Sequence, residues 1–213
     1  MARGALKLAK NLTKNLTRNP TRNPGRTAPQ RGRSRGSAAP FPLTTSRPEL
    51  LVEGRDRDFR HLVHSLFGFA ALHERIRAGH AQRIGLAGIE YTVLISIAHL
   101  SQDGDVNVKT VADHLYLSGA FITAITGRLL ARGLIEKKTD AGDRRRVTLT
   151  VAAKGRAALE RLAPIQRQVN DVEFGALTRE EFELLRGILD RLIESGGRAV
   201  ALQNYLLAGR GPR

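Results

Sequence analysis

The sequence predicts a mainly α-helical fold that contains one small β-hairpin, an α+β arrangement. Three observations predict it. Apolar residues recur at spacings of three and four in several segments after residue 55, which is the pattern of one helical face. Val147, Leu149 and Val151 alternate with threonines, which is the period of a strand, and a second short run at 134–138 precedes them. A polar loop around Gly142 separates the two runs and predicts a turn between two strands.

The stretch from 107 to 133 carries two short helical patterns around a tight turn. Asn107 and Ser118 are each suited to cap a helix, because their side chains can accept a hydrogen bond from a free backbone N–H in the first turn. Gly133 follows the second pattern in the manner of a C-cap glycine. The second helix is expected to bury one apolar stripe, made of Ile122, Ile125 and Leu129.

The opposite face of this second helix carries small and polar residues, and the loop after it is basic. The face holds Gly119, Ala120, Thr123 and Ala124, with Phe121 at its margin. The loop between the two strands holds Arg144, Arg145 and Arg146. A helix that fits a DNA groove, followed by a basic hairpin that reaches the backbone beside it, is typical of a DNA-reading unit.

This order of motifs resembles the MarR family of bacterial transcription regulators. Val111 to Leu115 matches the first helix of the family's motif, and Ser118 begins its recognition helix. Leu129 to Ile135 matches the exit Leu-x-x-x-Gly-Leu-Val, and Asp143-Arg144-Arg145 matches the Asp-x-Arg wing. The resemblance covers roughly residues 55–192. It implies a winged helix-turn-helix with an all-helical dimerisation domain made of the first and the last two helices.

Composition and the resemblance together indicate a domain organisation: the composition marks the tail, and the resemblance marks the domain that follows it. We expect residues 1–48 to be a disordered basic tail and residues 49–213 to be a MarR-like domain. Within that domain we expect the winged helix-turn-helix at about 88–151 and dimerisation helices at about 55–80 and 152–207. The charged segment 49–58 is expected to enter the first helix, and Gly196-Gly197 is expected to end the helix that opens at Thr178.

The implied function is that of a ligand-responsive DNA-binding transcriptional regulator, a repressor that binds a palindromic operator as a homodimer. Its implied partners are double-stranded DNA, a second copy of the chain and a small aromatic or anionic effector. No enzymatic activity, cofactor or metal is expected, and the implied location is the bacterial cytoplasm, associated with the nucleoid. The alternative function is a non-specific architectural nucleic-acid-binding protein that uses the basic tail.

Two groups of residues are candidates for DNA contact. Ser118 and Thr123 can donate to phosphate or base edges, and apolar side chains beside them can touch thymine methyl groups. In the loop, Arg145 matches the family's minor-groove arginine and Asp143 the acid that holds it. The full set is Ser118, Gly119, Ala120, Phe121, Thr123, Ala124, Asp143, Arg144, Arg145 and Arg146. Relatives often have long side chains where this sequence has Gly119, Ala120 and Ala124, so guanine readout by this helix is not expected. Core packing is the alternative for Phe121.

The candidates for effector binding are His64, Tyr91 and His99, which lie on apolar helices near the expected junction of the two parts of the domain. The alternative for each is core packing. His61 and His64 lie three apart and could in principle hold a metal. No cysteine accompanies them in the chain, so they are expected to be partly buried or surface histidines rather than metal ligands.

Composition separates the first 48 residues from the rest. The chain has 213 residues and a formal net charge of +15, and residues 1–48 hold eleven of its Lys and Arg residues and no acid. The tail is interpreted as an electrostatic arm that follows DNA phosphates. The alternatives are a solvated tail without a role, a translation-start artefact with the true start near Leu50 or Val52, and an organelle transit peptide. No apolar run approaches the roughly 20 residues that a membrane helix needs, so no membrane partner is expected.

Overall fold

The computed structural model describes residues 41–139 and 147–209 of the chain. It divides into two units, Met1–Ser46 and Arg47–Arg213. In the first unit, the described residues 41–46 form neither helix nor strand. In the second unit the elements follow in the order η1 (Pro48–Leu50), α2 (Arg57–Arg83), α3 (Gly88–Leu100), α4 (Val108–Leu115), α5 (Gly119–Ala131), β1 (Ile135–Thr139), β2 (Val147–Val151), α6 (Ala153–Glu173) and α7 (Arg179–Leu207).

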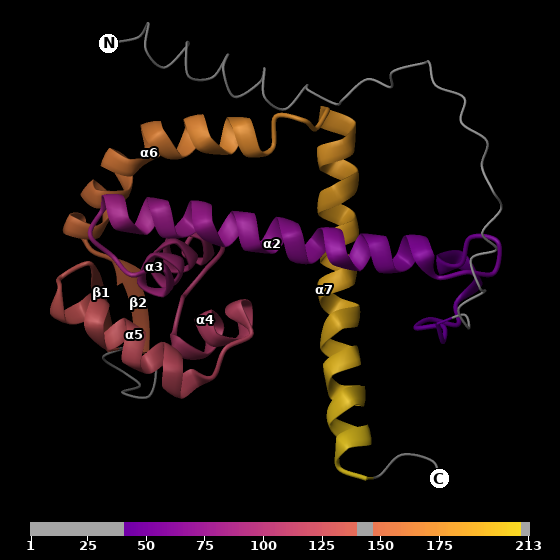
Figure 1. The fold of residues 1–213 in the computed structure, drawn as a ribbon. Coiled ribbons are helices and arrows are strands. Elements are labelled where there is room, and N and C mark those ends of the chain that lie inside the picture. The colour runs from indigo at the N-terminus through magenta and orange to yellow at the C-terminus, as the bar shows by residue number, and fades with distance from the viewer. Residues whose placement is uncertain (1–40, 140–146, 210–213) are drawn as a thin grey trace, which may run out of the picture. The chain divides into compact units, whose positions relative to one another are not determined.

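The predicted fold class is confirmed: the second unit is mainly helical and carries one antiparallel hairpin. Strands β1 and β2 pair from Ile135 opposite Val151 to Thr139 opposite Val147. The N–H of Leu149 donates to the carbonyl of Val106 at 2.7 Å, which ties β2 to the segment that precedes α4. Figure 1 shows α3, α4, α5 and the hairpin gathered near the C-terminal end of α2, with α6 leading away from the hairpin toward α7.

Helix α3 forms the centre of the core. Its apolar residues Val93, Leu94 and Ile97 have no exposed surface, and the buried stripe of α5 lies in the same cluster. Fully burying one such side chain contributes about 1.5–3 kcal/mol to folding. The cluster also draws in residues of α2, α4, the hairpin and α6, namely Ala81, Val111, Ile135, Leu149 and Leu162. The helix-turn-helix of α4 and α5 and the hairpin, together called the reading unit below, are therefore assembled around α3.

The expectation that residues 49–58 enter the first helix is wrong. Helix α2 begins at Arg57, and the chain before it reverses direction in a two-residue turn. Val52 and Arg55 exchange backbone hydrogen bonds of 3.0 and 2.9 Å, and the two residues between them, Glu53 and Gly54, both have positive φ. Two left-handed residues define a tight hairpin turn, which a continuous helix cannot contain.

The expectation that Gly196-Gly197 ends the last helix is also wrong. Helix α7 runs unbroken to Leu207, so residues 200–207 are its final turns rather than a separate segment. Glycine costs about 1 kcal/mol in a helix interior, but it ends a helix only where it takes a left-handed conformation. Apolar residues continue beyond the glycines, including Val200 and Leu202, so the same amphipathic helix continues.

Helices α2 and α7 bury little of their surface within one chain. Helix α7 has no buried residue, and α2 has only His80 and Ala81, near its C-terminal end. Their exposed large apolar side chains are Leu62, Leu66, Phe67, Phe69, Leu72, Phe182, Leu184, Leu185, Leu189, Leu192, Ile193, Val200, Leu202, Tyr205, Leu206 and Leu207. Exposed apolar surface on this scale is typical of an interaction surface.

The first turn of α6 lies directly on the chain segment that joins α5 to the hairpin. A Cβ atom at Gly155 would stand 2.1 Å from the carbonyl oxygen of Leu134 and 2.9 Å from a methyl group of Val151. The same Leu134 oxygen accepts a hydrogen bond of 3.0 Å from the N–H of Ala152. Only glycine permits this approach, so the end of the reading unit and the start of α6 are fixed to one another.

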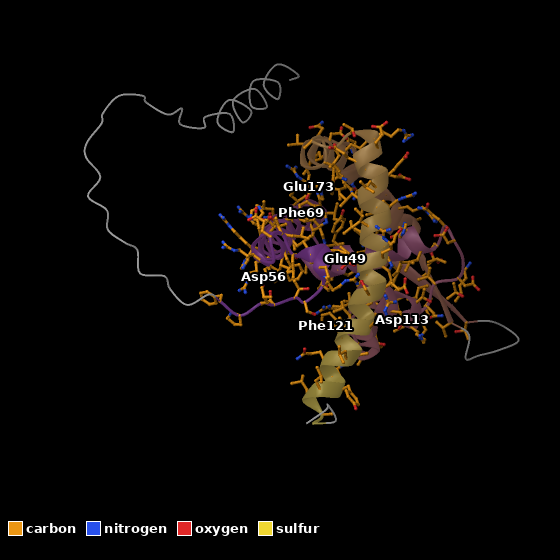
Figure 2. The ribbon with its side chains drawn as sticks, turned by 90° about the vertical axis from the view of Figure 1, so that its right-hand side faces the viewer. Glu49, Asp56, Phe69, Asp113, Phe121 and Glu173 are labelled. Carbon is orange, nitrogen blue, oxygen red and sulfur yellow. The ribbon has the colours of Figure 1, made fainter. Side chains whose placement is uncertain are left out.

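A polar cluster joins α2 to α6 and α3. His73 of α2 forms a 2.9 Å hydrogen bond with Glu173 at the end of α6, and Phe69 and Phe174 meet edge to face beside it. Figure 2 labels Phe69 and Glu173 in this region. One turn further along α2, Arg77 donates to the hydroxyl of Thr92 in α3. These contacts link the long helices to the reading unit.

No single helix in the described ranges is both long and apolar enough to cross a membrane. Helices α2 and α3 together reach the length and composition, with a bend of 88° at the break between them.

We predict that Gly155→Ala lowers the free energy of unfolding by about 1–3 kcal/mol, the usual cost of overpacking, because the added methyl group must displace a backbone carbonyl. Urea unfolding followed by circular dichroism measures this change. Gly127→Ala is the control, since a Cβ at this helical glycine meets nothing within 4 Å. The control should stabilise the helix by about 0.5–1 kcal/mol. Equal stability of the two variants would contradict the close approach.

We predict that His80 makes stability fall as the pH is lowered. Burial is the largest influence and lowers the pKa of His80; a hydrogen bond with Asn170 and the charge of Glu173 oppose it, while Arg83 and His73 act in the same direction as burial. The folded chain therefore binds this proton less readily than the unfolded chain. The free energy of unfolding should be fully retained above about pH 6.5 and should fall below it, by at most about 1.4 kcal/mol per pH unit.

Urea titrations at a series of pH values and one protein concentration measure this slope. His80→Gln should flatten it, and His64→Gln, which removes an exposed histidine from the same helix, should leave it unchanged. An undiminished slope in His80→Gln would assign the effect to other groups.

Candidate nucleic-acid interface

Helices α4 and α5 form the predicted helix-turn-helix, and both predicted caps are confirmed. The side chain of Asn107 accepts from the N–H of Thr110 at 2.9 Å, and that of Ser118 accepts from the N–H of Phe121 at 3.3 Å. Tyr116 closes α4 in the left-handed conformation, with φ of 54°. Because the chain reverses over only three residues, the start of α5 is held next to the end of α4.

One face of α5 is buried and the other is open, as the spacing of its residues predicts. Ile122, Ile125 and Leu129 are at most 1% exposed. The predicted DNA-contact residues of α5 and its N-cap are exposed, namely Ser118, Gly119, Ala120, Phe121, Thr123 and Ala124. Phe121 is 44% exposed, so the alternative that it is a core residue is wrong (Figure 2).

The open face of α5 has a specific chemistry. The hydroxyl of Thr123 donates to the carbonyl of Gly119 at 2.8 Å, which leaves its oxygen lone pairs as acceptors toward a partner. Ala120, Phe121 and Ala124 offer apolar contact, which suits the methyl group of thymine. The glycine and alanine residues also leave room for the helix backbone to approach a groove closely.

Two exposed residues beside this face were not among the predicted site residues. Tyr116 is 69% exposed and Leu117 is 38% exposed, and both lie in the turn that precedes α5. The sequence signal for them is an aromatic and an aliphatic residue directly before the N-cap, where a turn is usually polar. With Phe121, they are the exposed large apolar side chains in the first turn of α5 and the turn before it.

The wing is described only at its base. Strand β1 carries Lys137 and Lys138, both exposed, toward the loop that joins it to β2. Asp143, Arg144, Arg145 and Arg146, the predicted wing contacts, lie outside the described residues.

The three candidate effector residues lie in three different environments. His64 is exposed on α2 and meets the ring of Phe67 edge to face. Tyr91 is 1% exposed and packs against His80; burial raises the pKa of its hydroxyl. His99 is exposed at the end of α3, with its ring 5.9 Å from that of His114 in α4. The described contacts do not bring the three together.

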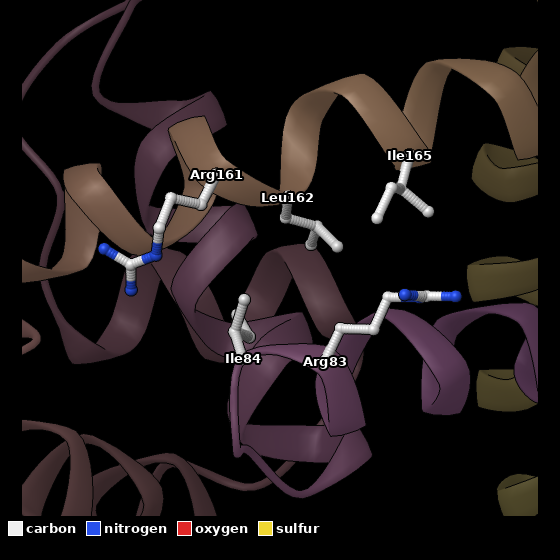
Figure 3. Close-up of a pocket in the computed structure, with 5 residues that line it drawn as sticks. All are labelled: Arg83, Ile84, Arg161, Leu162 and Ile165. Carbon is white, nitrogen blue, oxygen red and sulfur yellow. The ribbon is translucent and has the colours of Figure 1, made fainter. Parts of the chain in front are cut away.

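A cavity of about 300 Å³ opens between the end of α2 and the middle of α6. Ile84, Leu162 and Ile165 supply its apolar lining, and Arg83 and Arg161 its charge. In Figure 3 the two guanidinium groups extend away from each other, so each could meet a separate anionic group at the rim. Within the described part of the chain, no three His, Asp or Glu side chains are grouped so as to hold a metal ion.

Comparison with known proteins identifies the reading unit. Residues 84–146 match the sequence model described as the MarR family. The transcriptional repressor NicR of Pseudomonas putida is 34% identical over 80 residues, which cover 38% of this chain and 51% of that protein. This chain thus matches about half the length of that relative.

Solved structures agree with this assignment. A mutant of MarR from E. coli, solved in complex with operator DNA, superimposes with a TM-score of 0.53 at 17% identity, covering 63% of this chain and 95% of that one, which shows the fold. BpsR of Bordetella bronchiseptica has a TM-score of 0.50 at 25% identity, covering 61% of this chain and 90% of its own.

The match therefore spans α3, the helix-turn-helix and β1, and it includes the open recognition face and its two capped helices. Regulators of this family are DNA-binding transcription factors rather than enzymes. From the fold, the motif and these relatives together, residues 84–146 of this chain are a DNA-reading unit of the MarR family of transcriptional regulators.

Proposed function

We propose that this regulator is a repressor that binds a palindromic operator as a homodimer. The observation that carries the proposal is the pairing of an open recognition face on α5 with unburied apolar faces on α2 and α7. A second copy of the chain is the partner that would cover those faces. A symmetric dimer presents two recognition helices to adjacent major grooves, and such a dimer reads a palindrome.

The chemistry of α5 supports readout through apolar contacts rather than through arginine and guanine. Its exposed face pairs Phe121 with alanine side chains, and thymine is the base that offers a methyl group in the major groove. We further propose that Arg145 enters the minor groove beside this contact. A narrow, A·T-rich minor groove concentrates negative potential and attracts arginine.

The name of NicR supports repression, since it is called a transcriptional repressor. The BpsR structure concerns the regulation of its DNA binding by 6-hydroxynicotinic acid. We therefore propose control by a small anionic aromatic effector. The cavity beside Ile84, Leu162 and Ile165 supports this proposal, because it offers apolar side chains and two arginines to a small anionic molecule.

Architectural binding without sequence preference is the second candidate function. The concentration of basic residues in the first 48 positions favours it, because phosphate contacts carry no sequence information. A regulator and an architectural protein differ in one measurable quantity, the ratio of affinity for a selected sequence to affinity for unrelated DNA.

Selection from a random-sequence duplex pool, followed by titration of the selected sequence and a scrambled one at fixed salt, tests the proposal. We expect a palindromic consensus, with a specificity ratio of at least about 10³. Arg145→Ala should weaken operator binding by about 1–3 kcal/mol and reduce the preference for A·T-rich DNA under the wing. Added 6-hydroxynicotinic acid and related aromatic acids then test effector control in the same titration.

Arg167→Ala is the control for Arg145→Ala, because it removes one positive charge from an exposed position of α6, outside the wing loop. A consensus that is absent, or a ratio near one, would favour the architectural function. Unchanged affinity in Arg145→Ala would remove the minor-groove contact from the proposal.

A further inference from the structure

A single buried carboxylate connects the recognition helix to the core helix. Glu90, in the first turn of α3, is only 8% exposed. One of its oxygens lies 3.3 Å from Nε of Arg128, and the other accepts from Nη1 of Arg132 at 3.2 Å. That second oxygen also accepts from the backbone N–H of Ala87 at 3.1 Å, which caps α3. Glu90 therefore serves one helix as a cap and another as an anchor.

The C-terminal end of α5 is held from two further directions. Nη2 of Arg132 donates to the carbonyl of Gly85, in the loop between α2 and α3, at 2.8 Å. Nζ of Lys154, in the first turn of α6, donates to the carbonyl of Arg132 at 2.8 Å. The last turn of α5 is thus connected to α3, to the loop before α3 and to α6. The first turn of α5, by contrast, carries the exposed face and depends on this end for its direction.

The burial of the three charged groups is unequal, and this decides which of them matters most. The side chain of Glu90 is 10% exposed, whereas those of Arg128 and Arg132 are 57% and 43% exposed. The two arginines can be solvated without their partner, but a buried carboxylate needs its hydrogen bonds and opposite charges. The negative charge of Glu90 is therefore the group around which the two guanidinium groups are ordered.

We propose that Glu90 is a positioning residue that fixes the direction of the recognition helix and thereby sets operator specificity. This inference rests on the proposed function. Its charge also offsets two arginines that would otherwise be free to attract any phosphate. Loss of that charge should weaken specific binding, because α5 is less well directed. It should leave binding to unrelated DNA unchanged or slightly stronger, because phosphate attraction is independent of sequence.

Glu90→Gln separates the anchor from the cap. Glutamine fits the same cap position and can still accept from the N–H of Ala87, but it carries no charge for the arginines. Glu181→Gln is the matched control, since Glu181 occupies the same position in α7 and accepts from the N–H of Thr178 at 2.8 Å. Neither substitution removes a helix cap, so a difference between them reports the charge on Glu90.

The experiment measures dissociation constants for the selected operator and for scrambled DNA, together with amide hydrogen exchange of the full chain. In Glu90→Gln the specificity ratio should fall about tenfold, which corresponds to 1.4 kcal/mol. Amides of residues 128–134 should exchange faster, while the Glu181→Gln protein should match the wild type in both. A ratio within about twofold of the wild type, or unchanged exchange in a folded Glu90→Gln protein, would overturn the proposal.

Two further outcomes keep the inference separate from the proposed function. A wild-type ratio near one would refute sequence-specific regulation, and the exchange of residues 128–134 would then decide alone whether Glu90 positions α5. If Glu90→Gln does not fold, the double variant Arg128→Gln with Arg132→Gln removes the same ion pairs from their exposed side. A reduced ratio in that folded variant supports the anchor, and an unchanged ratio overturns it.

Discussion

Helix α3 is buried on most of its surface by the elements that pack against it. Its apolar residues lie at the centre of a cluster that takes in α2, α4, α5, the hairpin and α6. A helix that is apolar on nearly all sides must be covered on nearly all sides. The elements that cover α3 are the parts of the DNA-reading unit, so their relative positions follow from how they pack on it. Glu90 adds a polar anchor to this apolar arrangement, at the end where α5 leaves the core.

Local chemistry made the reading unit predictable. Asn107, Ser118 and Gly133 each satisfy a helix end by a short-range rule, and each has the cap role that its residue type indicates. The stripe of Ile122, Ile125 and Leu129 identified the buried face of α5. The opposite face was therefore predicted to be exposed. These features involve residues at most four apart in the chain, so a sequence pattern contains the information that determines them.

Features that depend on distant contacts were not predictable in the same way. The pair Gly196-Gly197 has the composition of a helix end, but the helix continues because apolar residues recur beyond it. Glu90 anchors two arginines about forty positions away in the chain, and no local pattern indicates that contact. The sequence around Glu90 indicates only an acid in the first turn of a helix, where it can act as a cap. The tight approach at Gly155 and the exposed turn residue Tyr116 likewise depend on how helices meet. The effector candidates His64, Tyr91 and His99 were chosen by resemblance to a family rather than from a local pattern. In the structure each of them lies in different surroundings.

Hydroxyl-radical footprinting of the full chain on its selected operator tests whether two copies bind one stretch of DNA together. A bound dimer should give two protected segments on the same face of the duplex, separated by about one helical turn, roughly 34–36 Å. Both segments should appear together over one concentration range. A single protected half-site, or uniform protection along the fragment, would contradict binding as a dimer.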